Sequence, residues 1–148
     1  MPGDPAPLRR YTLFVYGTLL RGETSHTLLK DAASLGPATT AATFDLFDLG
    51  AYPALVFGGT TAVAGEVYEL EVRQLAAVDV HEEVPRLFKR ERIELADGRN
   101  VEAYVLDRDQ VRGRRRIRSG DWRTRFQVER PAGLRDSPFA AWARRRER

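Results

Sequence analysis

The sequence contains no cysteine, which excludes a disulfide framework, thiolate catalysis and any cysteine-ligated metal site. It has only two histidines, His26 and His81, and neither lies in a spacing that builds a histidine metal centre. No apolar run approaches the roughly twenty residues of a membrane-spanning helix. The segment 1–10, rich in Pro, Gly and Ala, lacks the apolar core of a secretory signal. We therefore expect no metal, no membrane partner and a cytoplasmic location.

What the sequence does contain is enough apolar material for one packed domain. The chain has 148 residues, of which 43% are hydrophobic and 30% are charged. This length and balance predict a single globular domain over residues 1–148. Within it, residues 1–10 are expected to be flexible, and residues 131–148, which include Pro131, Gly133 and Pro138, are expected to form an irregular tail.

The positive charge is modest overall but unevenly placed. Lys and Arg together number 24 against 21 acidic residues, and arginines gather at 112–118 and 144–148. Such runs can attract nucleic acid or an acidic partner, and they can equally be a solvated loop and tail. We favour the second interpretation, so a nucleic-acid partner is not expected.

The hydrophobic pattern predicts short strands with two short helices between them. Apolar alternation and β-forming residues predict strands, while apolar spacing at i, i+3 and i+7 and capping residues predict helices. The dipeptide Asp97-Gly98 favours a hairpin turn, because glycine accepts a positive φ. The expected strands are 11–16, 39–49, 55–57, 63–70, 88–95 and 101–107; the expected helices are 25–31, 72–82 and a short one near 139–145; 109–118 is a loop and 119–122 a short capped turn. This order predicts an α+β domain with a curled, partly closed, mainly antiparallel sheet.

Glu82 is the candidate acid/base group. Helical spacing places it on the side of Leu75 and Val78, where burial and the negative end of the helix dipole would raise its pKa. A carboxyl group with a pKa nearer neutrality can take up and return a proton. The alternative is a helix end turned to water, with Glu82 and Glu83 both exposed. Asp79 either lies beside Glu82 or caps or orients another group.

The turn after the first strand is the candidate substrate loop. Tyr16, Gly17, Thr18 and Leu19 follow the strand, and such loops can point successive backbone N–H groups into one concavity. Those donors suit a carboxylate or a developing oxyanion. A plain β-turn is the alternative. The segment is neither a Walker motif nor a dinucleotide fingerprint, so no cofactor is implied.

Several segments together resemble the γ-glutamyl cyclotransferase-like family, whose branches include γ-glutamylamine cyclotransferase and the cyclotransferase of butirosin biosynthesis. Their order and spacing match along most of the chain. The segments that carry the resemblance are YGTLLRGETSHTLL (16–29), AYPALV (51–56), VAGEVYEL (63–70), LAAVDVHEEVP (75–85) and FKRERIEL (88–95).

The resemblance implies a small mixed barrel that binds a γ-glutamyl group and releases its amine as 5-oxoproline forms. It carries the substrate-binding loop to Tyr16, Gly17, Thr18 and Leu19, and the acid/base role to Glu82. The chain departs from the family pattern twice. Phe88 stands where many members have a tyrosine, and Glu83 stands at a position that is commonly glycine.

The implied chemistry is intramolecular attack of the substrate's α-amine on its γ-carbonyl, with Glu82 as base and then acid. No metal or cofactor is required, and the partner is a small γ-glutamyl substrate. The identity of the leaving amine and the oligomeric state stay open, although the arginines near 108–118 suggest an acidic leaving portion. The alternative function is a non-catalytic binding module on the same barrel that contacts an acidic partner or nucleic acid through residues 112–118.

Two smaller features leave alternatives open. In Ser119-Gly120-Asp121-Trp122, the tryptophan is either a buried side chain beside a capping serine or a wall of the cavity mouth. Tyr52, Tyr68 and Tyr104 are expected to face the barrel interior, as core or as substrate wall.

Overall fold

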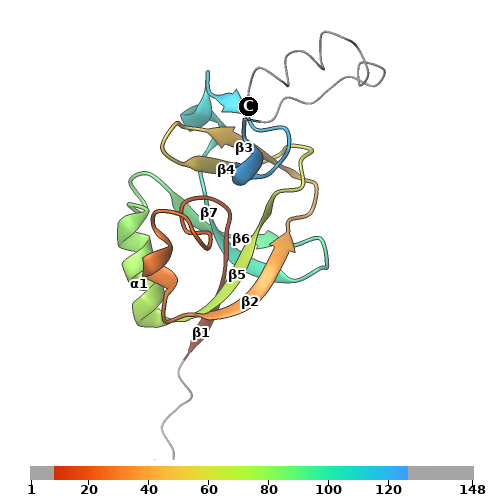
Figure 1. Ribbon diagram of the computed structural model, residues 1–148. Helices are drawn as coiled ribbons and strands as arrows, with labels where there is room; N and C mark the ends of the chain where they lie inside the picture. Colours follow the sequence, from red (N-terminus) through yellow and green to blue (C-terminus); the bar gives the residue numbers. More distant parts are fainter. Residues whose placement is uncertain (1–8, 127–148) are drawn as a thin grey trace, which may run out of the picture.

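The computed structural model describes residues 9–126 (Figure 1). It consists of eight strands, one α-helix and three 3₁₀ helices. In chain order these are β1 (Arg10–Val15), η1 (His26–Leu29), β2 (Ala33–Thr39), β3 (Phe44–Asp48), β4 (Pro53–Phe57), β5 (Ala64–Glu71), α1 (Val72–His81), β6 (Lys89–Glu94), β7 (Asn100–Val105), η2 (Arg108–Val111), β8 (Arg115–Arg116) and η3 (Trp122–Thr124).

All eight strands belong to one curled sheet that closes on itself in part. Its order is β2-β5-β1-β7-β4-β3-β8, and β6 pairs with β7 beside this path. The pairings of β7 with β1 and with β4 are parallel, and the others are antiparallel. A bridge between Thr40 and Leu95 joins the end of β2 to the end of β6. The predicted class, an α+β fold on a mixed, mainly antiparallel, partly closed barrel with short flanking helices, is confirmed.

The sheet forks at β7, and this fork later defines the site. The first half of β7 pairs with β1 through Leu13 and Glu102, whereas its last residue pairs with β4 through Leu55 and Val105. The end of β1 and the start of β4 therefore meet beside β7. In Figure 1, β3 and β4 form the upper part of the molecule, and β1, β2 and β5 curve through the lower part beside α1.

Both faces of the second half of β1 are buried, and β1 is an interior strand of the sheet. Leu13 and Val15 lie in one apolar cluster with Leu75 and Val78 of α1. The alternate residue Phe14 lies in a second cluster, as the two-residue period of a strand requires. Burial on both faces explains why 11–16 is recognisable as a strand from its composition alone.

The predicted strand 39–49 is wrong in its extent, and β2 was not predicted. The strand β3 covers only Phe44–Asp48, while β2 runs through 33–39 and contains Gly36 and Pro37. β2 is mostly exposed and pairs with β5, with a register shift between Ser34 and Gly36. At its end, the Thr39 carbonyl also accepts from the Ala96 N–H. An edge strand of this kind shows little apolar alternation, so its pairing partner defines it.

Three further local predictions need correction. The segment 25–31 forms only the 3₁₀ helix η1, and its N-cap Ser25 makes no side-chain capping bond. The predicted loop 109–118 contains most of η2 and the short strand β8. Trp122 is buried as expected, but the cap of its turn is Asp121, whose side chain accepts from the Arg123 N–H. The short helix predicted near 139–145 and the tail 131–148 lie outside the described residues.

Candidate active site

Helix α1 ends in a way that fixes the direction of Glu82. Glu82 is the C-cap residue, and its N–H donates to the carbonyl of Val78 at 2.9 Å. The Glu83 N–H donates to Val80 and the Val84 N–H to Asp79, which is the bond pattern of a Schellman motif. Glu83 accordingly has a φ of 54°, a value that favours glycine. Glu83, a residue other than glycine, thus occupies the left-handed position of this turn.

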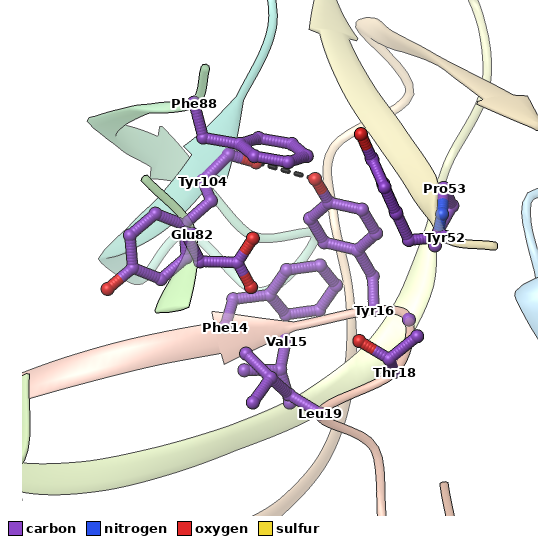
Figure 2. A pocket seen from close by; sticks show the side chains of 11 residues that line it. Phe14, Val15, Tyr16, Thr18, Leu19, Tyr52, Pro53, Glu82, Phe88 and Tyr104 are labelled. Carbon is purple, nitrogen blue, oxygen red and sulfur yellow. Dashed lines mark hydrogen bonds between the residues drawn. The ribbon is translucent and has the colours of Figure 1, made fainter. Parts of the chain in front are cut away.

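Of the two neighbouring glutamates, only Glu82 is withdrawn from solvent. Glu83 is exposed, whereas Glu82 is half-buried. Burial raises the pKa of Glu82 from 4.5 to about 7. Figure 2 shows its carboxyl group pointing toward the rings of Phe14 and Tyr16. The alternative in which Glu82 and Glu83 are both exposed is therefore wrong, and a carboxyl group with a pKa near neutrality stands at the helix end.

The turn that follows β1 presents backbone donors. Within it, the Leu20 N–H donates to the Gly17 carbonyl at 3.0 Å and the Ser25 N–H to the Thr18 carbonyl at 2.8 Å. Between residues 9 and 126, no hydrogen bond of the chain uses the N–H of Gly17, Thr18 or Leu19. Three successive backbone donors are consequently left for a ligand or water.

The same cavity contains Glu82 and this loop. It is open to solvent on one side, and aromatic rings make much of its wall (Figure 2). The residues around it are Phe14, Val15, Tyr16, Gly17, Thr18, Leu19, Tyr52, Pro53, Glu82, Phe88 and Tyr104. The structure therefore brings the candidate acid/base group, Glu82, together with the four residues of the candidate substrate loop, 16–19.

Tyr16 directly follows β1 at the fork of the sheet, and its hydroxyl group both donates and accepts a hydrogen bond there. The hydroxyl donates to the Tyr104 carbonyl of β7 at 2.6 Å and accepts from the Leu55 N–H of β4 at 3.1 Å. Burial raises the pKa of Tyr16 well above its usual value, against the lowering effect of the Leu55 bond. The Tyr16 ring lines the cavity, while its hydroxyl holds two strands together beneath it.

Asp79, Arg90 and Tyr104 form a partly buried polar cluster, of which the sequence analysis named Asp79 and Tyr104 without connecting them. Asp79 accepts hydrogen bonds from the Tyr104 hydroxyl at 2.7 Å and from the Arg90 guanidinium. Of its two predicted alternatives, Asp79 follows the one in which it orients another group. Burial, followed by the bond to Asp79, raises the pKa of Tyr104. The sequence offered no signal for this cluster, because its members come from α1, β6 and β7.

The remaining candidates divide between cavity wall and support. The Tyr52 and Phe88 rings lie 5.8 Å apart between their centroids, and both residues line the cavity, where Phe88 brings no hydroxyl group. Tyr68 is buried but lies outside the cavity lining, and His81 is exposed. Of the arginines that the structure describes, none lines the cavity, so the predicted contact of 108–118 with a leaving group is not found.

Comparison with known proteins identifies the family and the fold. The family model described as gamma-glutamyl cyclotransferase, AIG2-like, matches residues 13–124. The chain belongs to this family. Within the AIG2-like family, a Vibrio cholerae protein with the provisional name gamma-glutamylcyclotransferase is 41% identical over 113 residues, which cover 76% of this chain and 96% of that protein.

Two further AIG2-like relatives extend the comparison. The gamma-L-glutamyl-butirosin B gamma-glutamyl cyclotransferase of Niallia circulans is 31% identical over 134 residues, covering 84% of this chain and 82% of that one. The crystal structure of an AIG2-like protein from Mus musculus superimposes with a TM-score of 0.60 at 27% identity, covering 65% of this chain and 76% of that one. The family and the names of these relatives indicate a cyclotransferase enzyme.

Two searches of the described residues concern other kinds of site. Across 9–126, no group of three or more His, Asp or Glu side chains converges as metal ligands would. In the same part of the chain, no helix is long and apolar enough to cross a membrane.

Proposed function

We propose that this protein is a γ-glutamyl cyclotransferase that releases an amine from a small γ-glutamyl compound and forms 5-oxoproline. The observation that carries the proposal is the shared cavity. In it a half-buried carboxyl group, Glu82, lies with the three N–H groups of residues 17–19, which have no acceptor among residues 9–126. A proton carrier and an anion-binding loop are the two components that the reaction needs.

The proposed reaction exchanges one amide for another within the substrate. Glu82, ionised, removes a proton from the substrate's α-amine, whose nitrogen then bonds to the γ-carbonyl carbon. The bond from that carbon to the leaving nitrogen breaks, and Glu82 returns the proton to the leaving amine. No oxidant, reductant or nucleotide enters this balance.

The loop and the aromatic wall have separate proposed roles. The N–H groups of Gly17, Thr18 and Leu19 hold the substrate's α-carboxylate or the oxyanion on the γ-carbon. Tyr52 and Phe88 flank the mouth and exclude water from the reacting atoms. Holding the amine against the carbonyl in this way can supply about 7–11 kcal/mol of the barrier in favourable cases.

The alternative function, a binding module that uses the arginine-rich segment, gains no support from the structure. Arg115 and Arg116 form ion pairs with Asp48 and Asp45, and Arg112 pairs with Asp109. Side chains held in pairs within the chain are less free to neutralise an external polyanion.

The test is release of 5-oxoproline, measured by mass spectrometry, from a panel of γ-glutamyl amines and γ-glutamyl amino acids. Glu82→Gln should lower turnover by about 10²–10⁴-fold, the range of a lost general acid/base. The matched control is Glu83→Gln, which removes the adjacent exposed carboxylate and should leave turnover unchanged. Full turnover by Glu82→Gln would overturn the assignment of the proton carrier, and no release by the wild-type protein from any member would overturn the function.

A further inference from the structure

Glu66 on β5 lies outside the cavity, yet it is tied to the substrate loop. It stands opposite Val15 in the β1–β5 register, just before the loop begins. Its Oε1 accepts from the Arg21 N–H at 2.9 Å, a bond between residues 45 apart in the chain. The Glu66 side chain is only 17% exposed. A charged group at this depth is retained only if its partners compensate for lost hydration.

Those partners surround both carboxylate oxygens. Oε1 also accepts from the Tyr68 hydroxyl at 2.9 Å, and Oε2 faces the Arg123 guanidinium at 3.5 Å. Although burial raises the pKa of Glu66, these bonds, with that from the Arg21 N–H, together hold it below its usual value. The ionised form is thus the one that the fold selects.

Arg123 reaches the loop from the far end of the described chain. Besides facing Glu66, its guanidinium donates to the carbonyl of Arg21, 102 residues away in sequence. Glu66 therefore holds the N–H of residue 21, while Arg123 holds the carbonyl of the same residue. Both backbone polar groups of Arg21, two positions after Leu19, are therefore held by side chains from distant parts of the chain.

A second chain of contacts reaches the loop through Tyr68. Its ring lies 5.7 Å from the ring of His26, and the Nδ1–H of His26 donates to the Leu19 carbonyl at 2.9 Å. Leu19 is the last of the three residues whose N–H groups have no acceptor among the described residues. Orientation of its carbonyl also fixes the plane of the peptide group that follows.

We infer that Glu66 and Arg123 are positioning residues that hold the loop of residues 17–21 in the shape needed to bind the carboxylate of the substrate. The inference rests on the proposed function for the identity of the ligand. Their contribution is to binding, because the loop meets the carboxylate equally in the ground state and in the transition state. Loss of such uniform binding raises KM and leaves kcat unchanged.

The experiment compares Glu66→Ala with Glu66→Gln and with Glu69→Ala. Glu69 is on the same strand, but pairs with Arg10 instead of contacting the loop. We expect Glu66→Ala to raise KM for the best γ-glutamyl substrate at least tenfold, with kcat changed less than threefold. Glu66→Gln keeps an oxygen for the Arg21 N–H and the Tyr68 hydroxyl, so it should rescue most of the loss. Glu69→Ala should match the wild-type protein.

Arg123→Ala tests the other half of the pair. It should raise KM in the same direction, and the double variant with Glu66→Ala should lose less than the sum of the two single effects, because the two side chains share one contact. Unchanged KM in Glu66→Ala, a fall in kcat alone, or an equal effect of Glu69→Ala would each overturn the inference.

A readout without substrate separates this inference from the proposed function. The N–H groups of Leu20 and Ser25 are hydrogen-bonded within the loop. In Glu66→Ala their amide hydrogen exchange should accelerate at least tenfold, while exchange in the β1–β5 pairing stays slow. If the wild-type protein releases no 5-oxoproline but exchange accelerates, the function fails while the positioning of the loop stands. Unchanged exchange in a protein that is active refutes the positioning role alone.

Discussion

At the scale of single residues, the end of α1 separates two adjacent glutamates into different chemical groups. The Schellman turn sends Glu83 into solvent with a left-handed backbone and Glu82 toward the cavity. Glu82 loses hydration there, and this loss raises its pKa. Their sequence contexts are nearly identical, so the difference arises from the turn and from what packs against it.

The raised pKa of Glu82 has a consequence for stability that does not depend on any substrate. The folded protein binds this proton more tightly than the unfolded chain, whose glutamate has a pKa near 4.5. The free energy of unfolding should therefore fall as pH rises from about 4.5 to about 7, and level off above, by about 1–3 kcal/mol from this group. Glu82→Gln should remove the fall.

Urea unfolding of the wild-type protein and of Glu82→Gln, at pH 4 and at pH 8, checks this predicted effect of Glu82 on stability. At pH 4 the wild-type protein and Glu82→Gln should have similar free energies of unfolding, and at pH 8 the variant should be the more stable by about 1–3 kcal/mol. Glu83→Gln, at the exposed neighbour, keeps Glu82 and should therefore have the stability of the wild-type protein at both pH values. Equal stability of wild type and Glu82→Gln at pH 8 would mean that the carboxyl group is not desolvated.

At the scale of elements, the site depends on how closely the loop after β1 approaches the start of β4. A Cβ added to Gly17 would lie 2.5 Å from both Cγ and Cδ of Pro53. Contacts under 3 Å between carbon atoms force one of the two segments to move. Gly17 is not among the glycines with a positive φ. The close approach to Pro53, and not the backbone conformation, is therefore what requires glycine at position 17.

Gly17→Ala should accordingly lower the free energy of unfolding by about 1–3 kcal/mol, as overpacking does, and weaken substrate binding. The pyrrolidine ring is the obstacle, so Gly17→Ala combined with Pro53→Ala should recover part of the stability. Chemical unfolding of the two single variants and the double variant measures this coupling. Strictly additive losses would show that the loop and β4 do not press on each other.

At the scale of the whole molecule, Tyr16 links the two arms of the sheet. β1 and β4 both pair with β7, and the single Tyr16 hydroxyl bonds to a backbone group of β7 and to one of β4. The barrel strands and the β3–β4 arm are thereby joined at the floor of the cavity. Because its two hydrogen bonds hold β4 beside β7, the Tyr16 hydroxyl stabilises the fork of the sheet from which the substrate loop begins.

Tyr16→Phe should leave a buried carbonyl and a buried N–H without their partner. We expect a loss of about 1–3 kcal/mol in the free energy of unfolding and faster amide exchange of Leu55. Tyr52→Phe, which removes the hydroxyl of another cavity-lining residue, is the control and should cost under about 0.5 kcal/mol. A similar cost for both variants would show that the Tyr16 hydroxyl does not hold the fork.

Predictions made from local patterns succeeded where the pattern has a local cause. The central strand, the amphipathic helix and the hairpin β6–β7 all follow from periodicity or from one permissive glycine, and Gly98 indeed has a φ of 92°. Local patterns do not predict β2, because an exposed edge strand that contains Gly36 and Pro37 has no apolar periodicity. For the same reason the pattern of the arginine-rich segment predicts a loop, although Arg115 and Arg116 form β8 and pair with β3.

The sequence by itself therefore determined the family, the end of β1 shortly before Gly17 and the end of α1 beside Glu82, since each depends on neighbouring residues and their spacing. Only the tertiary structure decided that these two ends face one cavity, that Asp79 orients Tyr104 and Arg90, and that Arg123 reaches back 102 residues to the loop. The physical reason is that such contacts depend on the packing of distant segments. A spacing rule covers only a few turns or residues of one segment.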